Sequence, residues 1–237
     1  MDMRKKLFGV LLLAFIGNAW GLDANEAAGP DQNVFKTDFL VYSFTWQPTF
    51  CIMKPTTPGC EQPPQRLLSH GIWPYSKSEG EVTNRHPQFC TTSPACDKEA
   101  CAMPPDEMTA VLDNKPLRAL VTKEPQGMFA HEWRKHGTCS GKTMQAYFQD
   151  MVKFAGVAKF KDQEAFNALV GSEAPFSRIR NTFPDNTAFR CFKKDNVQFL
   201  HEVFYLIDAN GEPYHGEKSL QIGIRCNEEQ TRIPKGV

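Results

Sequence analysis

Eight cysteines restrict the folds open to this chain more than any other feature of its 237 residues. An even number of cysteines is typical of exported proteins whose thiols pair into disulfides. Eight cysteines allow roughly a hundred different pairings. Short spacing and order along the chain favour four pairs, namely Cys51–Cys60, Cys96–Cys101, Cys191–Cys226 and, by elimination, Cys90–Cys139. A metal site is the alternative, but the sequence lacks the Cys-x-x-Cys pairs of common zinc sites.

The N-terminus has the pattern of an export signal. Arg4-Lys5-Lys6 is a basic segment, residues 7–16 form an apolar run, and Gly17-Asn18-Ala19 supplies small residues for a signal peptidase. The apolar run is too short to span a bilayer. A buried N-terminal helix is the alternative. We therefore predict a signal peptide over residues 1–19, a periplasmic or secreted protein, and no membrane anchor after cleavage.

The rest of the chain predicts one α+β domain. Residues 20–36 are polar and lack periodicity, which predicts a flexible N-terminus, and residues 37–237 form the folded domain. Runs of β-branched and aromatic residues predict strands over 39–46, 66–73, 187–192, 197–208 and 220–226. Apolar periodicity predicts helices over 105–112, 128–136, 143–159, 163–170 and 176–183. Strands at both ends of a helical region favour a central, mostly antiparallel sheet flanked by helices and stapled by disulfides.

The charge balance limits how the protein can bind nucleic acid. Lysine and arginine together number 27, aspartate and glutamate also number 27, and the formal net charge is zero. A generally basic surface is therefore absent, so any contact with RNA or DNA must depend on a local site.

Two short segments concentrate the titratable chemistry. Ser69–Pro74 and His131–Cys139 contain three of the six histidines, next to a glutamate, a lysine and a tryptophan. Imidazoles act as acid and base near neutral pH, and an ammonium stabilises developing negative charge. On a helix at about 100° per residue, one arc of about 140° holds four side chains of the second segment. They are His131, Glu132, Lys135 and His136.

The second segment has two other interpretations, a zinc site and a solvent-exposed charged helix face. A zinc helix of the His-Glu-x-x-His type needs imidazoles at i and i+4, but here His131 and His136 are five apart and Lys135 occupies the i+4 position. A cation at that position argues against a metal ligand set. A charged helix face in solvent is the other alternative, and the matching His70 upstream argues against it.

These segments resemble the two active-site segments of the ribonuclease T2 family. The first is His70-Gly71-Ile72-Trp73-Pro74, and residues 131–139 match the second almost letter for letter. Residues 43–51 are similar to the first core strand and cysteine of that family, so the likeness extends from about Phe39 to Cys226. Exported bacterial members are the most similar.

The resemblance implies a metal-independent endoribonuclease without a cofactor. Such an enzyme cleaves single-stranded RNA by attack of the ribose 2′-hydroxyl on the adjacent phosphate, and leaves a 2′,3′-cyclic phosphate that is slowly hydrolysed. By this resemblance His136 is the general base, His70 the general acid, and His131 a phosphate ligand. Lys135 and Glu132 stabilise the phosphorane, and Glu132 also tunes nearby imidazoles. The implied partner is RNA, and the protein is expected to be a monomer.

The base-binding residues are open to two interpretations. Trp73 matches a stacking aromatic of the family, and Phe129 is a candidate for the same pocket, but both are equally explained as core residues. Tyr75 stands where some fungal members carry an aspartate that contacts the base, which predicts little base specificity. His86 and His215 are expected at the surface, and His201 is expected to be a hydrogen-bonded strand residue. A non-catalytic binding protein and a metal-dependent hydrolase remain the competing functions.

Overall fold

The computed structural model describes residues 36–78, 86–90, 101–218 and 220–237. The predicted signal peptide, residues 20–35 of the predicted flexible N-terminus, and Cys96 lie outside these residues. Among the helices of the described ranges, none is long and apolar enough to cross a membrane.

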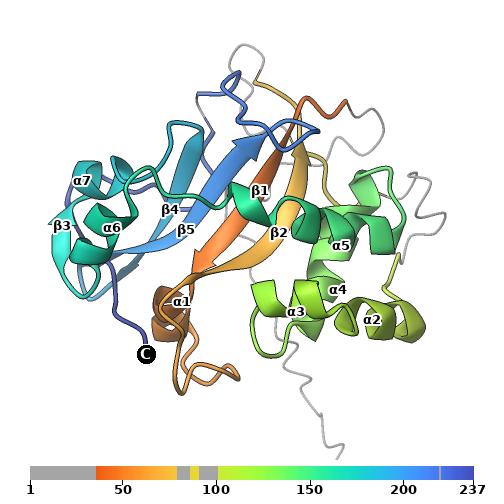
Figure 1. Ribbon diagram of the computed structural model, residues 1–237, viewed down its shortest axis with the longest axis horizontal. Helices are drawn as coiled ribbons and strands as arrows, with labels where there is room; N and C mark the ends of the chain where they lie inside the picture. Colours follow the sequence, from red (N-terminus) through yellow and green to blue (C-terminus); the bar gives the residue numbers. More distant parts are fainter. Residues whose placement is uncertain (1–35, 79–85, 91–100, 219) are drawn as a thin grey trace, which may run out of the picture.

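A six-stranded sheet runs diagonally through the molecule (Figure 1). Its strands are β1 Phe39–Trp46, β2 Leu67–Tyr75, β3 Glu173–Pro175, β4 Thr187–Lys194, β5 Val197–Ile207 and β6 Gln230–Arg232. The order is β2-β1-β5-β6-β3, and β4 pairs with β5. Among the strand pairs formed by described residues, only the short β5–β6 pairing is parallel. The predicted α+β fold with a mostly antiparallel sheet is thus confirmed.

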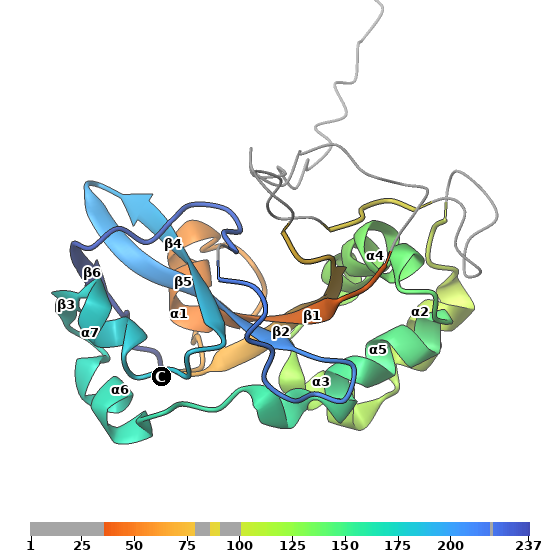
Figure 2. The same cartoon turned by 90° about the horizontal axis from the view of Figure 1, so that it is seen from above.

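Apart from α1, which follows β1 directly, the helices gather at the two ends of this sheet (Figure 1). They are α1 Gln47–Met53, α2 Pro105–Leu112, α3 Lys115–Leu120, α4 Gln126–Lys135, α5 Met144–Lys153, α6 Gln163–Leu169 and α7 Phe176–Arg180. Short 3-10 turns follow α4 and α5, at Gly137–Cys139 and Ala155–Val157. Figures 1 and 2 both show α2 to α5 grouped near β2 and β1, with α6 and α7 near β3 at the other end.

The sheet separates two apolar clusters because β5 alternates its side chains. Val203, Tyr205 and Ile207 join the larger cluster, which also contains residues of α4, α5 and α6. Phe204 and Leu206 face the other side and pack with Trp73, Tyr75 and three further residues in the smaller cluster. Both faces of the central strand are therefore buried.

Two predicted boundaries are wrong for identifiable reasons. Strand β2 does not stop at Pro74 but continues to Tyr75, because β2 is the edge of the sheet and an edge strand tolerates proline. The helix expected over 143–159 ends at Lys153. There Phe154 leaves the helical conformation and turns into the core, where its ring packs against Gly211.

The strand expected over residues 220–226 is absent from the described part of that segment. Its contact with β4 includes one backbone hydrogen bond, from Cys191 N to Ile224 O at 3.0 Å. Gly223 adopts a φ of +66°, which interrupts an extended conformation. A disulfide from Cys191 to Cys226, rather than a hydrogen-bond ladder, fastens this segment to the sheet.

A tight turn between β4 and β5 sets their register. Asp195 and Asn196 have φ values of +51° and +62°, the conformation of a type I′ hairpin turn. The turn pairs Lys194 with Val197 and Cys191 with Leu200, and a β-bulge between Arg190 and Cys191 then places Arg190 opposite Glu202. The hairpin therefore brings an arginine and a glutamate to one level of the sheet.

Three disulfides join described residues, and they are three of the four pairs favoured by spacing. Cys51 bonds to Cys60, Cys90 to Cys139, and Cys191 to Cys226. Cys90–Cys139 fastens residues 86–90 to the turn after α4, and the Phe89 N–H also donates to the Lys135 carbonyl oxygen at 2.9 Å. The second histidine segment is thus held at its C-terminal end.

We expect the loss of stability on removing a disulfide to follow the length of the loop it closes. Cys191 and Cys226 are 35 residues apart, whereas Cys51 and Cys60 are 9 apart. Replacing the first pair with alanine should lower the free energy of unfolding by about 4 kcal/mol, and replacing the second by about 3 kcal/mol. Urea unfolding of both variants measures this, and stability equal to that of the unmodified protein would contradict it.

Candidate active site

Two strand histidines lie on β-bulges at the same level of the sheet. Between β1 and β2 the register passes from Ser43↔Gly71 to Phe44↔Ser69, which leaves His70 without a partner. Between β4 and β5 it passes from Arg190↔Glu202 to Cys191↔Leu200, which leaves His201 without one. A bulge re-aims a side chain, and bulges are common beside active sites.

Helix α4 brings the second histidine segment to the same place. A cavity of about 500 Å³ is lined by the four residues that the helical projection put on one face, namely His131, Glu132, Lys135 and His136. His70, His201, Glu202 and Arg190 line it from the sheet. Trp133 points away into the core and Arg134 is exposed, as the projection predicted. The five residues predicted to be catalytic therefore converge with Trp73 on one cavity, whereas Phe129 does not line it.

A chain of contacts joins β2 to α4 through Glu132. The Trp73 indole N–H donates to Glu132 Oε2 at 2.6 Å, and His70 Nε2 lies 3.3 Å from Glu132 Oε1. Glu132 is 1% exposed. Gly71 is necessary here, because a Cβ at that position would collide with the Glu132 carboxylate and lie 2.7 Å from the Trp73 Nε1. The glycine of the first segment thus makes room for the glutamate of the second.

Glu202 is a site residue that the sequence reasoning missed. Its Oε1 lies 2.6 Å from His70 Nδ1, and its Oε2 accepts from Arg190 Nη1 at 2.9 Å. Thr45 and Ser43 on the intervening strand β1 also donate to Oε1, at 3.2 and 3.4 Å. The only signal in the sequence was a glutamate within an apolar strand, an unfavourable place for an unpaired charge.

The environments of His70 and His136 move their pKa values in opposite directions. Burial by itself lowers the pKa of His70, but Glu132 and Glu202 on its two nitrogens raise it well above the ordinary value. Burial lowers the pKa of His136 well below its ordinary value, and the nearby Lys135 lowers it further. Burial opposes ionisation of Glu132, but the pKa of that carboxyl is lowered, chiefly by His70.

The indole of Trp73 lies between these two imidazoles. Its ring stacks on His136 with the centroids 4.8 Å apart, and it meets the His70 ring edge-on at 5.7 Å. Trp73 is only 2% exposed, so a nucleobase could stack on it only if its neighbours moved. Phe129 is fully buried against Phe148. For both residues the structure agrees with the core alternative, and base binding stays a prediction.

The other three histidines, His86, His201 and His215, differ in how well their surroundings agree with the predictions. His215 is exposed, as predicted, and lies 3.6 Å from Asp185. His86 is not simply a surface residue, because its ring stacks on Tyr75 at 4.5 Å and lies 5.7 Å from the His136 ring. His201 is a strand residue, but its buried Nδ1 has no hydrogen-bond partner within the described part of the chain, so the expected bond is absent at that atom there. Burial lowers the pKa of His201 to about 4.

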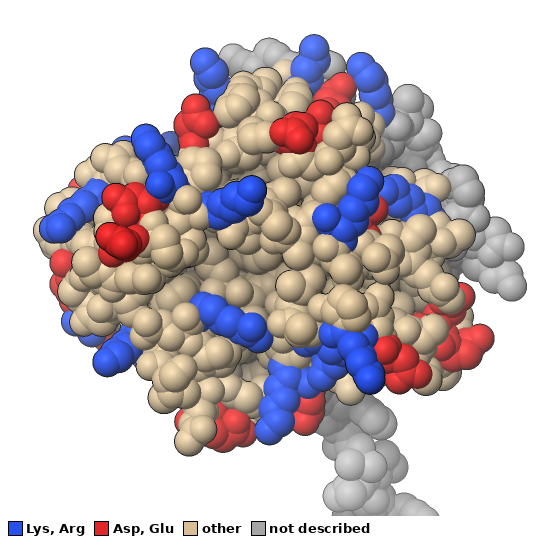
Figure 3. Space-filling model, in the orientation of Figure 1, with Lys and Arg blue, Asp and Glu red and all other residues tan. Residues whose placement is uncertain are grey.

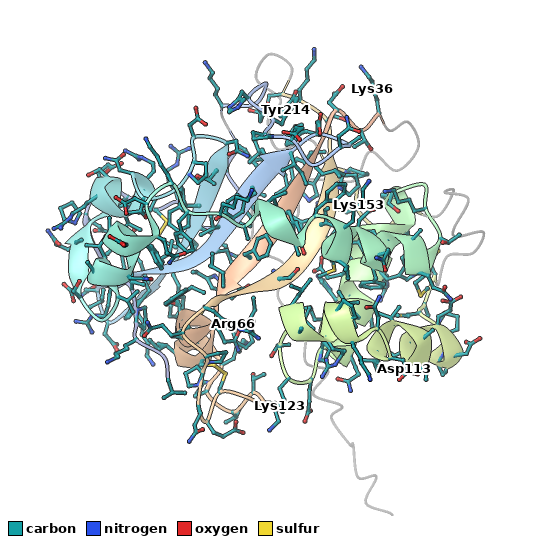
Figure 4. All side chains as sticks on the ribbon, viewed as in Figure 1. Lys36, Arg66, Asp113, Lys123, Lys153 and Tyr214 are labelled. Atoms are coloured by element: carbon teal, nitrogen blue, oxygen red, sulfur yellow. A yellow bond between two sulfur atoms is a disulfide. The ribbon has the colours of Figure 1, made fainter. Side chains whose placement is uncertain are left out.

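The cavity continues from the histidines toward helix α1 and the loop after it. Phe50, Met53, Pro58 and Met128 give that end an apolar lining, with Thr57 and Glu124 beside them. Gly59 of the loop approaches Lys123 closely, and Figure 4 shows Lys123 and Arg66 on the same side of the molecule.

No group of three or more histidine, cysteine, aspartate or glutamate side chains among the described residues is arranged to hold a metal ion.

Comparison with known proteins identifies a family. The family model of the ribonuclease T2 family matches residues 37–226. The intracellular ribonuclease LX of Solanum lycopersicum is 28% identical over 119 residues, which are 49% of this chain and 47% of that protein. A ribonuclease of Aeromonas hydrophila is 24% identical over 143 residues, which are 59% of this chain and 54% of that protein. The chain spans about half the length of these two relatives.

A solved structure supports the fold independently. The SF11-RNase of Nicotiana alata superimposes with a TM-score of 0.60 at 17% identity, and the match covers 84% of this chain and 100% of that one. At this identity the likeness establishes the fold alone.

Buried His201 should make the protein less stable in acid. An imidazole in the unfolded chain has a pKa near 6.5, whereas burial lowers that of His201 to about 4. Below pH 6.5 the unfolded state binds this proton first, so stability falls as the pH falls toward 4. His201→Gln should reduce the stability lost between pH 7 and pH 4 by on the order of 3 kcal/mol.

Urea unfolding at several pH values measures this effect. His215→Gln, which removes an exposed imidazole, is the control for the loss of a histidine as such. Parallel stability curves for His201→Gln and the unmodified protein would contradict the prediction.

Proposed function

Because the chain belongs to the ribonuclease T2 family, we propose that it is an exported endoribonuclease. It cleaves single-stranded RNA by transesterification to 2′,3′-cyclic phosphate ends, and a slower hydrolysis of that product follows. The reaction uses histidine acid–base catalysis without a metal. We propose both the RNA substrate and this activity for the whole protein, because the chain spans only about half the length of the two matched relatives.

The observation that carries the proposal is the opposite tuning of two imidazoles in one cavity. His70 has a carboxylate at each nitrogen, which holds its proton. His136 is buried beside Lys135, and both features favour the neutral imidazole. Among the described residues its buried Nδ1 has no hydrogen-bond partner. Titratable groups whose environments push their pKa values apart are the usual mark of an acid–base pair.

The proposed roles follow from these protonation states. Neutral His136 accepts the proton of the ribose 2′-hydroxyl as its oxygen attacks the adjacent phosphorus. Protonated His70 donates to the 5′-oxygen as the bond from phosphorus to that oxygen breaks. The products are a cyclic phosphate and a 5′-hydroxyl, and the histidines end in exchanged protonation states. DNA lacks the attacking hydroxyl and should not be cleaved.

The remaining site residues have supporting roles in this proposal. Lys135 and His131 line the cavity and supply positive charge and hydrogen bonds for the phosphate. Glu132 is held by Trp73 and lies against His70, which favours a role in tuning that imidazole over direct contact with the phosphorane.

The surface favours local rather than general contact with RNA. In Figure 3, lysine and arginine side chains are interspersed with aspartate and glutamate across the face shown. A monomer that binds RNA mainly in the cavity agrees with a net charge of zero. Little base specificity is expected, since Trp73 and Phe129 offer no exposed ring for selective contact. Export remains a prediction from residues 1–19.

Analysis of the product ends tests the reaction. Purified mature protein is incubated with a short RNA of defined sequence, with and without EDTA, and the fragments are measured by mass spectrometry. We expect 2′,3′-cyclic phosphate ends in equal yield under both conditions. Cleavage that EDTA abolishes would instead support a metal-dependent hydrolase, and no cleavage from acid to neutral pH would support a binding protein.

Single substitutions test the acid–base pair. His70→Ala and His136→Ala should each lower kcat by at least about 100-fold, the scale of a lost general acid or base. His215→Ala, which removes an exposed histidine, should leave kcat unchanged. Circular dichroism checks that the variants are folded. Near-normal activity of either site variant would refute its assigned role.

A further inference from the structure

His70 is held by two carboxylates, and only one of them belongs to the histidine segments. Glu132 comes from α4, whereas Glu202 comes from β5, 132 positions away from His70 in the sequence. The shorter contact is the one to Glu202, at 2.6 Å compared with 3.3 Å to Glu132. Each carboxylate faces a different nitrogen of the ring.

Glu202 itself is fixed on every side. The residue is 1% exposed, and both of its oxygens accept hydrogen bonds. Arg190, its neighbour on β4, holds Oε2, while the hydroxyls of Ser43 and Thr45 on β1 reach Oε1. Because these donors come from β1 and β4, the two strands that pair with β5 on either side of Glu202, the carboxylate cannot turn away from His70 without breaking several hydrogen bonds.

The geometry points to Glu202 as the positioning residue for His70. It holds the Nδ1–H of the imidazole, so that Nε2 is the nitrogen that delivers a proton into the cavity, and it keeps the ring in its charged form. This inference rests on the proposed function, in which His70 is the general acid. A carboxylate behind the far nitrogen is the usual means of fixing the tautomer and orientation of a catalytic histidine.

The charges around His70 explain why this contact matters. From the second segment it faces Glu132, His131, Lys135 and His136, from β5 it faces Glu202 and His201, and Arg190 lies behind Glu202 on β4. Burial opposes a positive charge on His70, whereas Glu132 and Glu202 favour it. Removing the charge of Glu202 would leave one carboxylate at the ring and would leave the nearby Arg190 guanidinium without its carboxylate partner.

The test is a titration of His70 together with the pH dependence of cleavage. Glu202→Gln keeps the shape of the side chain and removes its charge. The pKa of His70, followed by NMR without substrate, should fall by about one unit or more. The apparent pKa of the basic limb in the profile of kcat/KM against pH should fall by the same amount. The variant is therefore affected least in acid, and above this new pKa its kcat/KM falls about tenfold per pH unit.

Two further variants make the result interpretable. Glu173→Gln also removes a glutamate paired with an arginine, Arg232, but at the far end of the sheet, and it should leave both measurements unchanged. If Glu202→Gln does not fold because Arg190 loses a partner, the double variant Arg190→Gln/Glu202→Gln removes both charges together. It should show the same downward shift of His70 and of the basic limb.

The outcomes separate this inference from the proposed function. Equal loss of activity at every pH with an unchanged His70 titration would mean that Glu202 is only structural, and would overturn the inference. If His70→Ala is inactive while Glu202→Gln behaves like the unmodified protein, the inference fails and the proposed function stands. If His70→Ala is fully active, both fail.

Discussion

The buried contact of one imidazole with two carboxylates links the main parts of this structure. Glu132 and Glu202 are each 1% exposed, and a buried charge requires a partner of opposite sign. His70 is that shared partner, and Arg190 supplies a second positive charge to Glu202. The contact therefore joins helix α4, edge strand β2, and the hairpin of β4 and β5.

Several local features of the fold serve this contact. The bulge in β2 aims His70 into the cavity, and Gly71 leaves space for the Glu132 carboxylate. The type I′ turn after β4, together with the bulge at His201, sets the register that pairs Arg190 with Glu202. The Cys90–Cys139 disulfide holds the end of α4, where His136 follows the helix. These are features of backbone geometry, and together they place charged groups that would otherwise be costly to bury.

The three histidines differ in pKa because their partners and their exposure to solvent differ. His70 gains two carboxylates, His136 gains a lysine, and the Nδ1 of His201 gains no partner. The pKa values of His136 and His201 consequently fall, while that of His70 rises. Trp73 separates His70 from His136 and donates to Glu132, which is a structural use of an aromatic residue that its burial alone would not reveal.

The sequence by itself determined the features that depend on local order. The helical projection of residues 131–136 placed four side chains on one face, and the short spacing of Cys51 and Cys60 indicated a disulfide that the structure contains. The order of the cysteines, and elimination for the last pair, indicated Cys191–Cys226 and Cys90–Cys139, which the structure also contains. Only the tertiary structure decided that Glu202 reaches His70, that Trp73 is buried between two imidazoles, and that residues 220–226 are held by a disulfide instead of a strand ladder. The physical reason is that a helix fixes neighbouring side chains within a few residues, whereas strand register and bulges fix partners that are far apart in the chain.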